Sequence, residues 1–212
     1  MAKLLNGING PISGKVGAVV GYTWKGKAVI RSLPKKRTRP LSPLQLQQHA
    51  KFALINKFLN PLLSLLNLTF STVAVQMSGF SKAFSYNVKN AISGTHQALT
   101  INYSMVLLGR GDLPNAASPS AQSLNNGELV FNWTDNTATG QARANDKLYV
   151  AVYCEENNNW ISRVTETTRN DGTFTLTLDL FKGKLVQTYI GFITADGKDV
   201  SDSAYTGPVN IL

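Results

Sequence analysis

The chain has 212 residues, of which 43% are apolar and 16% charged, and these ordinary values exclude a disordered or collagen-like protein. Its single cysteine, Cys154, excludes an internal disulfide framework and a cysteine-based metal cluster. The net charge of +9 is unevenly divided: residues 1–111 contain 14 Lys and Arg and no Asp or Glu, whereas residues 112–212 contain 7 and 12. The first half, at +14, predicts a polyanion partner, usually nucleic acid, or attraction to the second half, at −5, within or between chains.

Apolar runs are too short for a membrane protein. No stretch of about 18 apolar residues is present, and the best candidate, residues 58–70, is interrupted by Pro61 and several polar residues. The first eleven residues have too short an apolar run for a secretory signal. We therefore expect no membrane partner, and a location in the cytoplasm or within a virion or other particle.

The first expected element is a β-hairpin. Alternating apolar residues over 16–24 predict a half-buried strand, Lys25 and Gly26 give a turn signal, and residues 27–33 predict the returning strand. The four glycines among residues 10–21 also have the spacing of a helix-packing face. In a helix each would cost about 0.5–1 kcal/mol relative to alanine, so the helical interpretation is rejected.

A basic, proline-bracketed segment follows, and we call residues 34–40 the basic arm. Proline at both ends favours an extended backbone, which suits a path along a surface or a phosphate backbone. A helix is expected next, because Ser42 is a good N-cap, Pro43 occupies the first helical position and Gln45 completes a capping box. This helix should run to about Asn60, where Pro61 stops or kinks it.

Less regular segments separate this helix from the second half of the chain. Residues 68–76 alternate and predict a strand or an extended connector. A second helix, capped by Ser81 and closed by Gly94, should follow, and then a strand over residues 97–108. A stretch rich in Gly, Pro, Ser and Asn marks a domain boundary, with a linker at residues 112–119.

The remainder of the chain predicts short strands separated by turns. The expected strands are residues 129–133, 147–154, 160–164, 174–178, 186–194 and 208–212, with hairpin turns at 125–127, 170–172 and 196–197. About seven strands, with Trp133 buried on an early one, predict an antiparallel immunoglobulin-like or fibronectin-like β-sandwich. The expected fold class is α+β, with a basic hairpin-and-helix region at residues 1–111 and the sandwich at residues 120–212.

Motifs at both ends of the chain resemble those of one protein family. They comprise residues 13–17, 20–26, 31–34 and 42–48 near the N-terminus, and 196–198, 200–203 and 205–207 near the C-terminus. This pattern is similar to that of a Bacteroidetes family of uncharacterised proteins. The resemblance implies a bacterial or bacteriophage setting, and it supplies neither an activity nor catalytic residues.

Several motifs that suggest catalysis are incomplete. Ser13-Gly14-Lys15 matches a fragment of a phosphate-binding loop, but the preceding Gly and the following Ser or Thr of that motif are missing. His49 and His96 have no carboxylate nearby in sequence. We therefore expect no enzyme activity and no cofactor or metal.

Three further features also favour structural roles. Cys154 has no adjacent histidine, so it is expected to pack in the core. Glu155 and Glu156 would point to opposite faces of a strand, which argues against a glycosidase pair. Residues 110–112, Arg-Gly-Asp, match an integrin-binding tripeptide, but Asp112 more simply starts a turn.

Basic and aromatic residues near the N-terminus form the candidate binding site. The residues expected to contact phosphates are Lys25, Lys27, Arg31, Lys35, Lys36, Arg37 and Arg39. Tyr22 and Trp24 could stack on unpaired bases. The alternatives are that Trp24 belongs to the core, and that the cations form a solvated face or linker.

These features predict a non-enzymatic structural protein of coat type. Its basic N-terminal half would contact nucleic acid or an acidic surface of a neighbouring subunit, and the protein would form a homo-oligomer. One alternative is a monomeric nucleic-acid-binding protein whose sandwich makes protein contacts. A weaker alternative is a surface adhesion module, which the absence of a signal sequence opposes.

Overall fold

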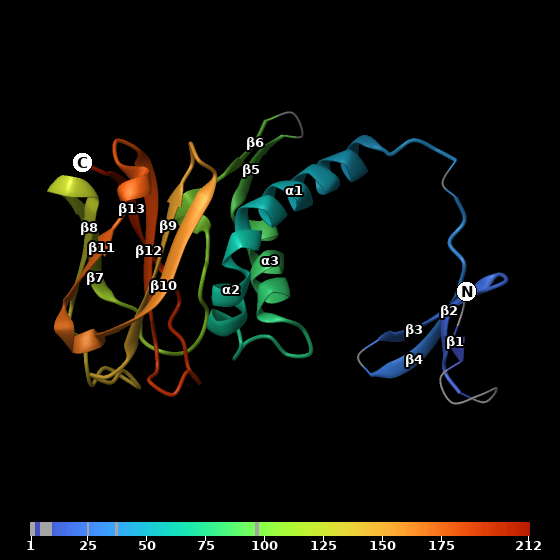
Figure 1. Cartoon of the computed structure of the whole chain (residues 1–212), viewed down its shortest axis with the longest axis horizontal. Helices are drawn as coiled ribbons and strands as arrows, with labels where there is room; N and C mark the ends of the chain where they lie inside the picture. The colour runs from blue at the N-terminus through green and yellow to red at the C-terminus, as the bar shows by residue number, and fades with distance from the viewer. Residues whose placement is uncertain (1–2, 5–9, 25, 37, 96–97) are drawn as a thin grey trace. The chain divides into compact units, whose positions relative to one another are not determined.

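The computed structural model describes residues 3–4, 10–24, 26–36, 38–95 and 98–212. They form two compact units, an N-terminal unit (Met1–Ser42) and a body (Pro43–Leu212), which Figure 1 labels element by element. Composition places the boundary at residues 112–119, about 70 residues further along the chain. The division after Ser42 instead groups the helices with the β-sandwich.

The N-terminal unit is a four-stranded antiparallel sheet in the order β1-β2-β3-β4. Its strands are β1 (Lys3–Leu4), β2 (Ile12–Val16), β3 (Val19–Trp24) and β4 (Lys27–Ser32). The predicted hairpin is confirmed as β3 and β4. Its first strand begins later than expected, however, because residues 17 and 18 form a turn in which Gly17 has φ +55°, a backbone conformation that favours glycine. The expected half-burial is wrong, since most of this sheet is exposed.

Helices open the body. They are α1 (Pro43–Leu59), a short 3-10 turn (Asn60–Leu62) that contains Pro61, α2 (Leu63–Thr69) and α3 (Gly79–Asn90). The first helix and its change at proline are confirmed. The cap of α3 is Ser78, whose hydroxyl accepts a hydrogen bond from the Ser81 N–H, so the predicted cap was three residues too late. None of the described helices is both long and apolar enough to cross a membrane.

The segment between the helices and the sandwich differs from its prediction. Residues 68–76 finish α2 and then turn, and they form no strand. The strand expected over residues 97–108 is limited to β6 (Ala98–Ile101), which pairs with β5 (Ile92–Thr95). After Ile101 the chain packs within the body, where Val106, Leu108 and Leu113 are buried. The Gly- and Pro-rich stretch at residues 109–119 is therefore packed and does not form a free linker.

The β-sandwich is confirmed, with seven strands in two antiparallel sheets. One sheet has the order β11-β8-β7 and the other β10-β9-β12-β13. The strands are β7 (Ala117–Leu124), β8 (Glu128–Thr134), β9 (Lys147–Cys154), β10 (Asn159–Thr168), β11 (Thr173–Thr177), β12 (Leu185–Ile193) and β13 (Ala204–Asn210). A three-stranded sheet facing a four-stranded sheet in this order is the fibronectin-like arrangement, which together with the helices makes the fold α+β.

Turns of the sandwich follow the sequence signals with one exception. Residues 125–127 join β7 to β8, and residues 196–197 lie between β12 and β13, as expected for hairpins. Residues 170–172 instead connect β10 to β11, which belong to different sheets, so this turn is a crossover between sheets. The first strand, β7, was not predicted, because its run of Ala, Ser, Pro and Gln has no large apolar residue before Leu124.

Both faces of the central strand β9 are buried. Alternate residues from Leu148 to Cys154 enter the core between the two sheets, where they meet Phe131 and Trp133 of the opposite sheet. The intervening residues Tyr149, Ala151 and Tyr153 face the helices. The body therefore has three layers, and Figure 1 shows the helices along one side of the four-stranded sheet.

An aromatic cluster joins the helical layer to the sheet. Phe58 of α1 packs edge-on against Trp160 and Tyr153, with ring centroids 5.0 Å and 4.8 Å away. The Trp160 indole N–H donates a 2.7 Å hydrogen bond to the Phe58 carbonyl oxygen. Burial raises the pKa of the Tyr189 hydroxyl, which stays protonated and donates to the Tyr103 carbonyl at 2.8 Å. These contacts explain why the helices and the sandwich form one unit.

Replacing Phe58 should therefore destabilise the whole body. We expect Phe58→Ala to lower the free energy of unfolding by about 3–5 kcal/mol, because it leaves a cavity at the contact between helix and sheet. Phe52→Ala on the same helix is the matched control, since Phe52 is 47% exposed. Urea unfolding followed by circular dichroism measures both variants, and equal losses would contradict the three-layer description.

Candidate nucleic-acid interface

One face of the N-terminal sheet carries both basic and aromatic side chains. Cross-strand partners share a face, and the register pairs Lys15 with Val20 and Val20 with Arg31. Further along β3 and β4, Tyr22 lies opposite Val29, and Trp24 opposite Lys27. We call this surface the basic–aromatic face, and it comprises Lys15, Val20, Tyr22, Trp24, Lys27, Val29 and Arg31.

The opposite face of the sheet is approached closely by its own chain at one position, Gly21. Gly21 belongs to the opposite face, because the faces alternate from one residue to the next along a strand. A Cβ added at Gly21 would lie 2.1 Å from the Ile12 carbonyl oxygen, so the start of β2 packs directly over this position. The register places no charged residue on this face of β2, β3 and β4. The two faces of the sheet therefore differ in chemistry: the opposite face is uncharged, and its Val16, Val19 and Ile30 are exposed.

Aromatic rings on the basic–aromatic face are accessible. Trp24 is 57% exposed and Tyr22 37% exposed, so the interpretation of Trp24 as a core residue is wrong for this unit. The Arg31 guanidinium lies 5.4 Å from the centre of the Tyr22 ring, at cation–π distance. Half-buried Val20 and Val29 lie between these side chains. The face thus presents ring surfaces within a set of positive charges.

The structure places the other predicted cations as follows. Lys27 and Arg31 are exposed on the sheet, and Lys35, Lys36 and Arg39 are exposed on the basic arm, whose described residues form no helix or strand. Lys25 and Arg37 lie outside the described residues. Lys15 was missed by sequence reasoning, because the turn at residues 17–18, which brings β2 beside β3, was not recognised.

The net positive charge of the chain lies in the N-terminal unit. Residues 1–42 contain nine Lys and Arg and no acid, whereas residues 43–212 contain twelve Lys and Arg and twelve Asp and Glu. The N-terminal unit therefore carries the whole net charge of +9, and the body has a formal charge of zero. A separate unit with this charge is a strong electrostatic attractor for a polyanion.

Candidate catalytic residues in the body do not converge. His49 is exposed on α1, and His96 lies outside the described residues. Cys154 is buried in the core between the sheets, as predicted, and Glu155 and Glu156 are exposed in the β9–β10 turn. Among the described residues, no three His, Cys, Asp or Glu side chains are grouped as a metal site would require.

The Arg-Gly-Asp tripeptide is part of the packing of the body. The Arg110 guanidinium lies 5.4 Å from the centre of the Tyr86 ring. The Gly111 N–H donates to Asp202 Oδ1 at 3.1 Å, and a Cβ at Gly111 would lie 2.2 Å from the Val200 carbonyl oxygen. These contacts explain why a glycine is needed at position 111, and they do so without an integrin-type receptor.

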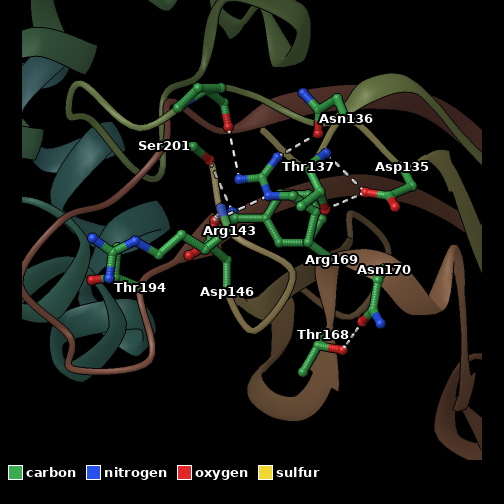
Figure 2. Close-up of polar contacts among 12 residues, drawn as sticks. Asp135, Asn136, Thr137, Arg143, Asp146, Thr168, Arg169, Asn170, Thr194 and Ser201 are labelled. Carbon is green, nitrogen blue, oxygen red and sulfur yellow. Dashed lines mark hydrogen bonds and ion pairs between the residues drawn. The ribbon is translucent and has the colours of Figure 1, made fainter. Parts of the chain in front are cut away.

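A buried ion pair is the main polar cluster of the sandwich (Figure 2). Arg169 Nε donates to Asp146 Oδ2 at 3.0 Å, and both side chains are fully buried. The other guanidinium nitrogens donate to Asn136 Oδ1 at 2.6 Å and to the Pro114 carbonyl at 3.0 Å. The guanidinium also lies 4.0 Å from the centre of the Phe192 ring. Burial lowers the pKa of Arg169, and its hydrogen bond to Asp146 opposes that change.

This cluster is structural. It connects the loops that precede β7 and β9 to the end of β10, and Asp146 Oδ2 also accepts from the Arg143 N–H at 2.9 Å. The Trp133 indole N–H donates to the Arg169 carbonyl at 2.7 Å, which ties the cluster to the core between the sheets. The Arg169 guanidinium is bound by protein groups from several loops, so its role is to hold these loops together.

Removing the carboxylate should be costly. We expect Asp146→Asn to lower the free energy of unfolding by about 3–5 kcal/mol, because it leaves the Arg169 charge buried without its partner. Glu166→Gln removes an exposed pair with Lys147 and should cost no more than about 1 kcal/mol. Urea unfolding at neutral pH compares the two variants, and similar small losses would show that Arg169 is stabilised by other means.

The fold and the charged surface together define an α+β protein in which a neutral helix-and-sandwich body follows a cationic β-sheet. The chain belongs to the family of unknown function DUF6266, which it matches over residues 11–207. This membership confirms the resemblance to an uncharacterised family. No protein of curated function matches the chain in sequence.

Solved structures similar to this chain include fibronectin type III domains. The fn3 domain of the human collagen alpha-1(XX) chain has 13% identity and a TM-score of 0.37, covering 49% of this chain and 90% of that domain. The FN1–FN3 domains of chicken CNTN1 have 16% identity and a TM-score of 0.38, covering 48% of this chain and 35% of that one. A myokine structure has 15% identity and a TM-score of 0.32, covering 46% of this chain and 94% of that one. The fold assignment rests on the strand order.

Proposed function

We propose that this protein is a non-enzymatic assembly protein of coat type, whose N-terminal sheet and basic arm bind nucleic acid. The observation that carries the proposal is the concentration of the whole net charge of +9 on residues 1–42, next to exposed aromatic rings. Cations positioned on one sheet face neutralise phosphates, and their binding releases the counterions of the nucleic acid. The neutral body supplies the surfaces for protein contacts.

Exposed apolar residues of the N-terminal unit support assembly. Val16 is 44% exposed and Ile30 59% exposed, and no apolar side chain among the described residues before Ile55 is buried. A sheet needs a second layer to bury its apolar residues. A neighbouring copy of the chain provides that layer in our proposal, which places the protein in a multi-subunit particle.

The second candidate is a monomeric nucleic-acid-binding protein with the sandwich used for protein contacts. The observation in its favour is the compact, closely packed body, which buries its own core. In both cases, the family resemblance suggests a bacterial or bacteriophage setting, and a location in the cytoplasm or in a virion.

Removing charge from the basic–aromatic face should weaken the salt dependence of nucleic-acid binding. In the variant Lys15→Gln, Lys27→Gln and Arg31→Gln, the slope of log affinity against log salt concentration should fall by about 2–3, because each phosphate contact contributes about 0.7–0.9. Fluorescence anisotropy of a labelled oligonucleotide at several salt concentrations measures this slope.

The matched control removes the same charge from the body. Lys57, Lys89 and Arg163 are exposed there, and changing all three to glutamine also lowers the net charge from +9 to +6. We expect this control to keep the slope of the natural chain. Equal reductions in the two variants would show that only total charge matters, and they would contradict a specific interface.

Particle mass separates the two candidates. We expect light scattering to give a discrete oligomer far above the 23.0 kDa of one chain at both low and high salt, because apolar contacts do not depend on salt screening. The ratio of absorbance at 260 and 280 nm should fall as salt releases bound nucleic acid. A monomer that binds nucleic acid would favour the second candidate, and a nucleic-acid-free monomer at both salts would contradict both.

A further inference from the structure

The two aromatic rings of the basic–aromatic face lie on one strand. Tyr22 and Trp24 are two residues apart on β3, so both side chains project from the basic–aromatic face. The other two tryptophans, Trp133 and Trp160, are 6% and 8% exposed. Trp24 is therefore distinct among the three tryptophans in presenting its ring to solvent. Exposed aromatic rings on a sheet can serve as stacking surfaces for planar ligands.

The distance between the Tyr22 and Trp24 positions favours single-stranded over double-stranded nucleic acid. Residues two apart on a strand are separated by about 6.8 Å along its axis. In a duplex the bases are stacked about 3.4 Å apart along each strand, and their faces are covered by their neighbours. Two rings about 6.8 Å apart suit two bases that have separated from each other. Such bases are available in a single strand and unavailable within an intact duplex.

Positive charges surround the two rings on the same face. Lys27 lies directly opposite Trp24 on β4, and the Arg31 guanidinium lies 5.4 Å from the centre of the Tyr22 ring. Lys15 lies beyond Val20 on β2, in the same row as Arg31. Each ring thus has a cation on an adjacent strand, and such cations contact the phosphates of a bound nucleic acid.

We propose that the basic–aromatic face binds single-stranded nucleic acid, with two successive bases stacked on Tyr22 and Trp24 and their phosphates against Lys15, Lys27 and Arg31. This proposal rests on the proposed function, because it specifies the class of polyanion. Stacking tolerates any base, so the site discriminates between single and double strands more than between sequences.

Intrinsic fluorescence of the full chain tests the proposal directly. Because Trp24 is the tryptophan open to solvent, stacking of a base on it should quench the emission accessible to iodide. The probes are an oligothymidylate of about 15 nucleotides, a duplex of the same length and heparin. We expect tight binding and quenching with oligothymidylate, and weaker, salt-sensitive binding without quenching for the other two. Equal affinities with no quenching would overturn the single-strand proposal.

Variants of Trp24 provide a second readout by anisotropy of a labelled oligonucleotide. Trp24→Leu should reduce affinity for oligothymidylate about 5- to 150-fold, the loss of one stacked base, and leave heparin binding unchanged. Trp24→Phe keeps an aromatic ring and should retain most of the affinity, which separates lost stacking from misfolding. Phe52→Leu is the control, because Phe52 is an exposed aromatic residue on α1.

The outcomes separate this proposal from the proposed function. If oligothymidylate, duplex and heparin all bind equally and Trp24→Leu has no effect, the chain binds polyanions through charge alone, and the single-strand proposal fails. If none of the three probes binds at low salt, the proposed function fails as well. If Trp24→Phe loses as much affinity as Trp24→Leu, the role of stacking is contradicted.

Discussion

The architecture of the body depends on one constraint: both faces of β9 must be buried. Leu148, Val150 and Val152 face the core between the sheets, while Tyr149 and Tyr153 face the helices. A strand of this kind needs a layer on each side, so the helices cannot form an independent domain. The aromatic cluster around Phe58 covers the helix-facing side of β9. The body also has equal numbers of basic and acidic residues.

The N-terminal sheet is under the opposite constraint. Nine cations on 42 residues without a carboxylate repel one another, and the unit has no buried apolar core of its own among the described residues. A protein maintains such a surface at a cost in stability, which a bound polyanion and a second apolar layer would offset. The basic–aromatic face carries the cations and the exposed rings of the sheet, whereas the opposite face is uncharged. Charge and exposed rings therefore point to the same surface.

Sequence patterns predicted those parts of the fold where local chemistry and tertiary packing agree. The predicted cap at Ser42 marked the start of α1 correctly, and alternation with turn residues marked six of the seven sandwich strands. The strand β7 was missed because it consists mostly of small residues. Residues 112–119 were predicted to be a linker because the packing of Leu113 depends on Val200, far away in the sequence. The cations of the site could be predicted. Their shared face could not, because it depends on the turn at Gly17 and on the cross-strand register.

Photochemical cross-linking of the full chain to an oligothymidylate that carries a photoreactive base tests the central claim most directly. Cleavage after Lys15 and Lys25 releases residues 16–25, which contain both Tyr22 and Trp24. If the N-terminal sheet is the nucleic-acid interface, mass spectrometry should find the adduct in this peptide, and excess unlabelled oligonucleotide should remove it. Adducts confined to the body, formed with the same affinity, would contradict the account.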